Sequence, residues 1–98
     1  MAEITITGAD QWTEPVKIGI GRDWDVRVHS PVGFSGTVVV QRRRDYEGTS
    51  PTAGWQNVEG EVYTGAVDRY GKVANINWEF RIGSPDGSGS IVAGIWAD

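Results

Sequence analysis

A chain of 98 residues has the length of one domain, and we expect residues 1–98 to form a single unit. The absence of cysteine excludes disulfides and thiolate catalysis, and a net charge of −4 argues against binding to nucleic acid, which requires clustered positive charge. No apolar run approaches the roughly 20 residues of a membrane-spanning helix, so we expect no membrane partner. The first residues lack the basic start and apolar stretch of a signal peptide, which predicts synthesis in the cytoplasm.

The first half of the chain predicts short strands separated by turns. Ile4 and Ile6 alternate with polar residues, which is the period of a strand, and residues 1–12 are expected to be an N-terminal arm or an edge strand. Pro31 and Gly33 predict a turn. Three consecutive valines predict that the fourth strand is covered on both faces. The strands expected in this half are Glu3–Thr7, Val16–Ile20, Trp24–His29 and Gly36–Arg42.

The second half of the chain begins with a polar loop, Arg43–Gly54, which we expect to be exposed. Pro85, Asp86 and Gly87 predict a hairpin loop over Gly83–Gly89. Val67–Lys72 has no clear period and is left unassigned. The strands expected in this half are Trp55–Val58, Glu61–Thr64, Asn75–Ile82 and Ser90–Trp96.

Composition supports the same class of fold. Fourteen glycines and four prolines are spread along the chain and favour frequent turns. Five tryptophans and many β-branched residues favour strands, and leucine, a strong helix former, is absent. Seven or eight short strands at this spacing predict an all-β protein, an antiparallel β-sandwich of immunoglobulin-like size. Trp24, Trp78 and Phe80 share a face with apolar neighbours and are predicted core residues.

The ionisable residues do not form a recognisable catalytic or metal-binding pattern. His29 is the only histidine, which excludes a histidine-based triad or a multi-histidine metal site within one chain, and we expect it on a solvent-facing strand position. Asp23 and Asp25 could bind Ca²⁺, but Arg22 and Arg27 lie close enough in sequence to neutralise them, so a solvated charged face is the favoured interpretation. We therefore predict no enzyme activity, no metal and no cofactor.

Four segments together resemble small β-sandwich structural proteins of tailed-bacteriophage virions. They are Phe34–Arg42, Gly54–Val58, Trp78–Gly83 and Gly87–Val92, which follow one another in the order of a Gly-Thr strand, a Trp-x-x-Val strand, an aromatic-x-Arg strand and a Ser-Gly strand. The resemblance covers roughly residues 34–96. It implies a virion structural role, either as a head decoration (cement) protein or as a connector or tail accessory protein, and it implies no active site.

Residues that could bind a partner lie near the chain ends and around the basic run. The partners expected are other virion proteins, namely the major capsid protein or connector and tail subunits, or further copies of this chain. For the exposed tryptophans two alternatives remain, stacking on sugars as in a carbohydrate-binding module or plugging the ends of the sandwich. The arginine run has the alternative of a charged strand end that protects the sheet. The candidate partner-binding residues are Ile4, Ile6, Trp12, Arg42, Arg43, Arg44, Trp55 and Trp96.

Overall fold

The computed structural model describes residues 2–19, 21–44, 54–64, 67–69 and 78–97. Their backbone is all-β, and every strand pair is antiparallel. In this part of the chain there is no helix long and apolar enough to span a membrane. The strands are β1 (Ala2–Ile6), β2 (Gln11–Trp12), β3 (Val16–Ile18), β4 (Trp24–Ser35), β5 (Val38–Arg44), β6 (Gln56–Tyr63), β7 (Val67–Arg69), β8 (Trp78–Ser84) and β9 (Ser88–Ala97).

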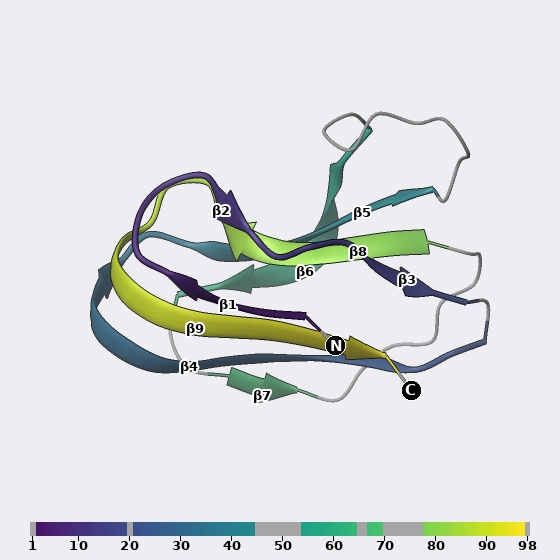
Figure 1. Cartoon of the computed structure of the whole chain (residues 1–98), viewed down its shortest axis with the longest axis horizontal. Helices are drawn as coiled ribbons and strands as arrows, with labels where there is room; N and C mark the ends of the chain where they lie inside the picture. Colours follow the sequence, from purple (N-terminus) through teal and green to yellow (C-terminus); the bar gives the residue numbers. More distant parts are fainter. Residues whose placement is uncertain (1, 20, 45–53, 65–66, 70–77, 98) are drawn as a thin grey trace.

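The strands form two packed sheets, which confirms the predicted β-sandwich (Figure 1). The first sheet, called sheet A here, has the order β1-β9-β4-β7. The second, sheet B, has the order β2-β8-β5-β6, with β3 also paired to β8. The N-terminal segment is therefore the edge strand of sheet A rather than a free arm, which decides between the two alternatives for residues 2–6.

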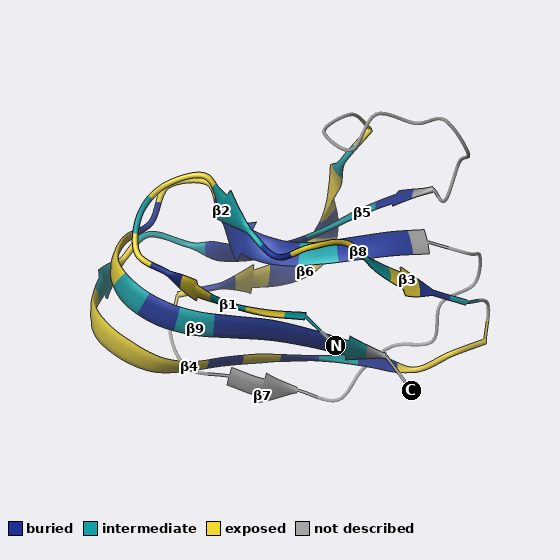
Figure 2. Ribbon diagram, in the orientation of Figure 1, coloured by how far each residue is buried: buried dark blue, intermediate teal, exposed yellow. Residues whose placement is uncertain are grey.

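The core lies between the two sheets and follows the period-two pattern of the sequence (Figure 2). Phe80 is 2% exposed, and its ring centroid lies 4.9 Å from that of the buried Trp24, so two of the predicted core residues are confirmed. The side chain of Trp78 lies outside the described part of the structure. Val38, Val39 and Val40 are all buried, as predicted for a strand that is covered on both faces.

Strands β2 and β3 lie end to end along the same edge of β8. Trp12 pairs with Gly83, and Val16 pairs with Phe80, so the two segments occupy successive stretches of one partner strand. Pro15 stands in the interruption between them, where its ring and missing N–H disfavour a continuous ladder. Thr13 bridges the gap, because its N–H donates to the Ile82 carbonyl at 2.9 Å and its hydroxyl accepts from the Ile82 N–H at 3.1 Å. β2 has only two residues and ends at this interruption, which explains why the sequence analysis does not predict it as a strand.

The predicted hairpin over Gly83–Gly89 is wrong, because β8 and β9 belong to different sheets. The chain crosses from sheet B to sheet A at this point, and the β4–β5 connection crosses beside it. The backbone N–H and the hydroxyl of Thr37 both donate to Asp86 Oδ1, at 2.9 and 3.0 Å. Gly36 has a φ of 115°, and a Cβ there would lie 2.8 Å from the Asp86 carbonyl oxygen, so the two crossings pack too closely for a side chain.

The predicted turn at Pro31 and Gly33 is also wrong, because β4 continues through it to Ser35. Its pairing with β9 shifts register between His29 and Val32 and again between Val32 and Ser35. The chain accommodates these residues at the register shifts, where Ser30 and Gly33 have positive φ angles of 54° and 59°. The predicted loop Arg43–Gly54 begins two residues too early, because Arg43 and Arg44 belong to β5, and its residues 45–53 lie outside the described part of the chain. Residues 70–72 of the unassigned stretch and residues 75–77 of the predicted strand Asn75–Ile82 also lie outside it.

Candidate interaction surface

An alternating stack of tryptophan and arginine side chains lies on the outer face of sheet B. The Arg81 guanidinium carbon is 4.3 Å from the centroid of the Trp12 ring and 4.5 Å from that of Trp55. The Arg43 guanidinium carbon is 4.6 Å from the Trp55 centroid. We call these four residues, Trp12, Arg81, Trp55 and Arg43, the ladder. Each contact is short enough for a cation–π attraction, which is stronger where water is partly excluded.

Strand register explains why the ladder residues meet. Phe80 and Ile82 point into the core, so Arg81 between them and Gly83 after them lie on the outer face, and Trp12 shares the face of its partner Gly83. A Cβ at Gly83 would lie 2.7 Å from the Trp12 ring and 2.1 Å from the Gln11 carbonyl oxygen. The glycine therefore provides the space in which the Trp12 ring lies against the sheet.

Polar side chains hold the arginines of the ladder in place. Arg43 pairs with Glu79 across β5 and β8, with Arg43 Nη2 3.2 Å from Glu79 Oε2 and side chains that are 7% and 11% exposed. Arg81 donates from Nε and Nη2 to Gln41 Oε1 at 2.9 and 2.6 Å, and Gln41 Nε2 donates to Asn57 Oδ1 at 2.9 Å. These contacts connect β8, β5 and β6 through side chains and fix the direction in which each guanidinium points.

Electrostatics at Arg81 reflect this packing. Burial lowers the pKa of Arg81 below its ordinary value, Asp10 raises it, and the like charge of Arg43 lowers it further. The ordinary pKa of arginine is so high that the side chain stays charged at neutral pH. Asp10 also accepts a hydrogen bond from Trp12 Nε1 at 2.9 Å, so one carboxylate both orients the indole and faces the guanidinium.

A groove of about 440 Å³ opens beside the ladder, between the edge of sheet A and the segment that joins β2 to β3. β1 contributes Ala2, Glu3 and Ile4, and the facing segment contributes Trp12, Thr13 and Glu14. Ile4 and Trp12 are half-buried, and both glutamates are exposed. The groove is thus partly apolar, has two carboxylates and lies along an edge strand.

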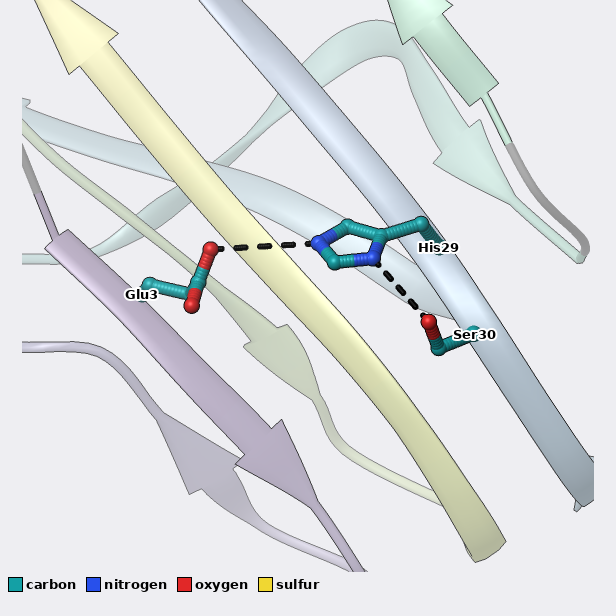
Figure 3. A network of polar contacts seen from close by, with 3 residues as sticks. All are labelled: Glu3, His29 and Ser30. Atoms are coloured by element: carbon teal, nitrogen blue, oxygen red, sulfur yellow. Dashed lines mark hydrogen bonds and ion pairs between the residues drawn. The ribbon is translucent and has the colours of Figure 1, made fainter.

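The Glu3 side chain lies on the outer face of sheet A and reaches across β9 (Figure 3). Glu3 Oε2 is 3.8 Å from His29 Nε2 on β4, and both side chains are about half exposed. His29 Nδ1 lies 3.2 Å from the Ser30 hydroxyl. The prediction that His29 occupies a solvent-facing strand position is therefore confirmed.

Two of the predicted partner-binding residues are less accessible than the sequence suggested. Ile6 is 0% exposed and belongs to the core, so its side chain offers no surface to a partner. Arg43 is buried with Glu79, which means that the arginine run does not act as one open basic patch. Arg42 is half-buried on the opposite face of β5, and the side chain of Arg44 is outside the described residues.

The remaining candidates are half-buried tryptophans that lie on the outer faces instead of plugging the sandwich ends. Trp12 and Trp55 belong to the ladder. Trp96 lies on the outer face of sheet A, where a Cβ at Gly94 would be 2.6 Å from its ring and Arg27 approaches its centroid to 5.4 Å. Ile4 and Trp12 meet at the groove, whereas Trp96 is on the other sheet, so the structure does not gather all the candidates into one site.

Several important residues of this surface were not predicted from the sequence. They are Arg81, Gln41, Asn57 and Glu14, none of which is among the predicted partner-binding residues. Alternation identifies which face each residue occupies, but it does not say which strands are neighbours. For Asp23 and Asp25, the described part of the chain contains no group of three or more histidine, aspartate or glutamate side chains that could hold a metal ion.

Comparison with known proteins adds no relative: no family model matches the chain, and no curated protein or solved structure matches it significantly.

Proposed function

We propose that this protein is a non-enzymatic structural subunit of a tailed-bacteriophage particle, a capsid decoration protein that binds neighbouring virion proteins. Two observations support the proposal: the sequence segments that resemble virion β-sandwich proteins, and a fold of the class that this resemblance implies. The observation that carries the mechanism is the open groove beside β1, whose outer edge pairs with no other strand in the described part of the chain. Burial of such a surface across a joint between other subunits opposes their separation.

The charge of the chain suits this role. A decoration subunit has to bind its neighbours better than it binds itself, and a net charge of −4 makes free copies repel one another. The two exposed glutamates of the groove make this docking surface negatively charged, like the chain as a whole. A neighbour of opposite charge would therefore be favoured over a second copy.

The ladder weighs against the alternative of a carbohydrate-binding module. Sugar stacking needs an accessible aromatic face, and guanidinium groups already lie against the rings of Trp12 and Trp55. Titration of tryptophan fluorescence with oligosaccharides distinguishes the two functions. A saturable change would favour the carbohydrate-binding module over the virion subunit.

The direct experiment is to purify particles of the phage that encodes the chain, with and without its gene. We expect the chain to sediment with intact heads, and heads that lack it to break at a lower temperature. Addition of the recombinant chain should restore the higher temperature. Absence of the chain from purified particles would overturn the proposal, and its presence only at the head–tail joint would replace decoration by a connector role.

A further inference from the structure

We propose that β1 is a docking edge to which an extended, basic segment of a neighbouring protein adds as an extra strand, with its apolar side chains in the groove beside Ile4. This inference rests on the proposed function and names the edge and the chemistry of the partner. Three features support it, namely the edge that β1 presents in the described structure, the lining of the groove and the charge around it.

The first feature is the regularity of β1 as an edge strand. Among the described residues β1 is hydrogen-bonded only to β9, through five consecutive pairs without a register shift. An edge strand directs every second N–H and C=O away from its neighbour, where an added strand can pair with them. β1 contains no proline and no lysine, which are two of the usual devices that block such pairing. The edge strand β6 of sheet B, by contrast, has a bulge in its pairing.

The second feature is the groove on the inner side of the same edge. Ala2 and Ile4 are only partly buried and pack against the core, so the hydrophobic interior is incompletely covered at this point. A strand added to β1 would alternate its side chains, and those on the inner face would cover Ile4. The groove volume of about 440 Å³ is large enough for apolar side chains of that strand.

The third feature is charge. Glu14 stands across the groove from β1, and Glu3, whose carboxylate reaches across β9 towards His29, also lines the groove, so a strand added there would place alternate side chains in an acidic environment. Lysine or arginine at those positions would meet carboxylates, whereas acidic residues would be repelled. β1 itself carries no basic residue, so pairing between two copies of β1 would lack this complementarity.

The test uses the full chain and a short capped peptide of alternating arginine and valine, followed by NMR amide shifts. We expect shifts confined to residues 2–6 and 12–14, and a loss of binding when the peptide backbone is N-methylated at alternate residues. Glu3→Gln and Glu14→Gln should each weaken binding about two- to fivefold, the range of an exposed ion pair. Glu59→Gln, an exposed glutamate on β6, is the matched control and should leave the affinity unchanged.

Three results would overturn the inference. They are an absence of shifts, shifts elsewhere on the sandwich, and binding that tolerates N-methylation. If the chain forms dimers through β1 and does not bind the peptide, the occupant of the edge is a second copy of the chain and not a basic segment of another protein. If the peptide does not bind and the chain still sediments with particles, the assignment of β1 as the docking edge is wrong but the proposed function stands. If the peptide binds but purified particles lack the chain, the proposed function is wrong and the docking edge is kept.

Discussion

The interior of the sandwich and the outer face of sheet B use aromatic side chains in opposite ways. In the interior, Trp24 packs on Phe80 with no charge between the rings. On the outer face, Trp12 and Trp55 are separated by Arg81, and Arg43 lies against Trp55. The first arrangement is stabilised by removal of apolar surface from water, and the second by guanidinium groups that cover rings left at the surface.

The comparison shows which aromatic residues are available to partners. The rings of Trp24 and Phe80 are buried in the core, whereas Trp12 and Trp55 are half-buried and keep part of their surface exposed beside arginines that Gln41 and Glu79 hold in place. Trp12 belongs to both the ladder and the groove, so it links the stability of sheet B to the proposed docking edge.

The largest effect is expected in the interior. Phe80→Ala should lower the free energy of unfolding by about 3–5 kcal/mol, because it leaves a cavity beside Trp24. Chemical denaturation measures the loss, with Val62→Ala as control, since Val62 is 52% exposed and its truncation should change stability by less than about 0.5 kcal/mol. A loss below about 1 kcal/mol for Phe80→Ala would mean that the inward face of β8 is misassigned.

A smaller effect is expected where Trp12 meets the sheet. Gly83→Ala places a methyl group against the Gln11 carbonyl and the Trp12 ring, and should cost about 1–3 kcal/mol through overpacking. The near-ultraviolet circular dichroism of tryptophan should change with it. Gly8→Ala is the matched control, because its nearest neighbour would be 4.0 Å away. Equal stability of the two variants would contradict the close contact between β2 and β8.

The ladder itself should contribute less. Arg81→Met keeps an unbranched side chain between the rings but removes the charge and both hydrogen bonds to Gln41, so we expect a loss of about 1–2 kcal/mol. Arg22→Met, at an exposed position outside the ladder, provides the comparison and should be nearly neutral. If both variants unfold at the same denaturant concentration, the ladder has no stabilising role.

The smallest effect concerns the corner where the sheets cross. Hydrogen bonds from the backbone N–H and the hydroxyl of Thr37 hold the pKa of Asp86 below its ordinary value of 3.8. Because the folded pKa is depressed, this carboxylate stabilises the fold above the unfolded pKa, and the contribution disappears as pH falls through the folded pKa. An NMR titration of Asp86 should show the low pKa, and Thr37→Ala should raise it. An unchanged titration in that variant would exclude the Thr37 hydroxyl as a cause.

The sequence predicts the interior better than the outer face for a physical reason. Alternation identifies buried positions such as Trp24 and Phe80 without knowledge of strand order, because inward-facing residues must be apolar whichever strand is adjacent. The ladder depends on which strands pair and in what register, as with Trp12 opposite Gly83, and this information is not local. The β8–β9 crossing was read as a hairpin for the same reason, since Pro85, Asp86 and Gly87 favour a turn of either kind.

The claim that the β1 groove is the docking surface can be tested most directly by co-sedimentation of the chain with particles that lack it. Glu14→Arg reverses a charge of the groove, and Val62→Arg introduces the same residue at an exposed position on the far strand of sheet B. Both variants should fold with wild-type stability, and Glu14→Arg should weaken particle binding about tenfold or more while Val62→Arg leaves it unchanged. Wild-type binding by the Glu14→Arg variant, or equal loss in both variants, would contradict docking through this groove.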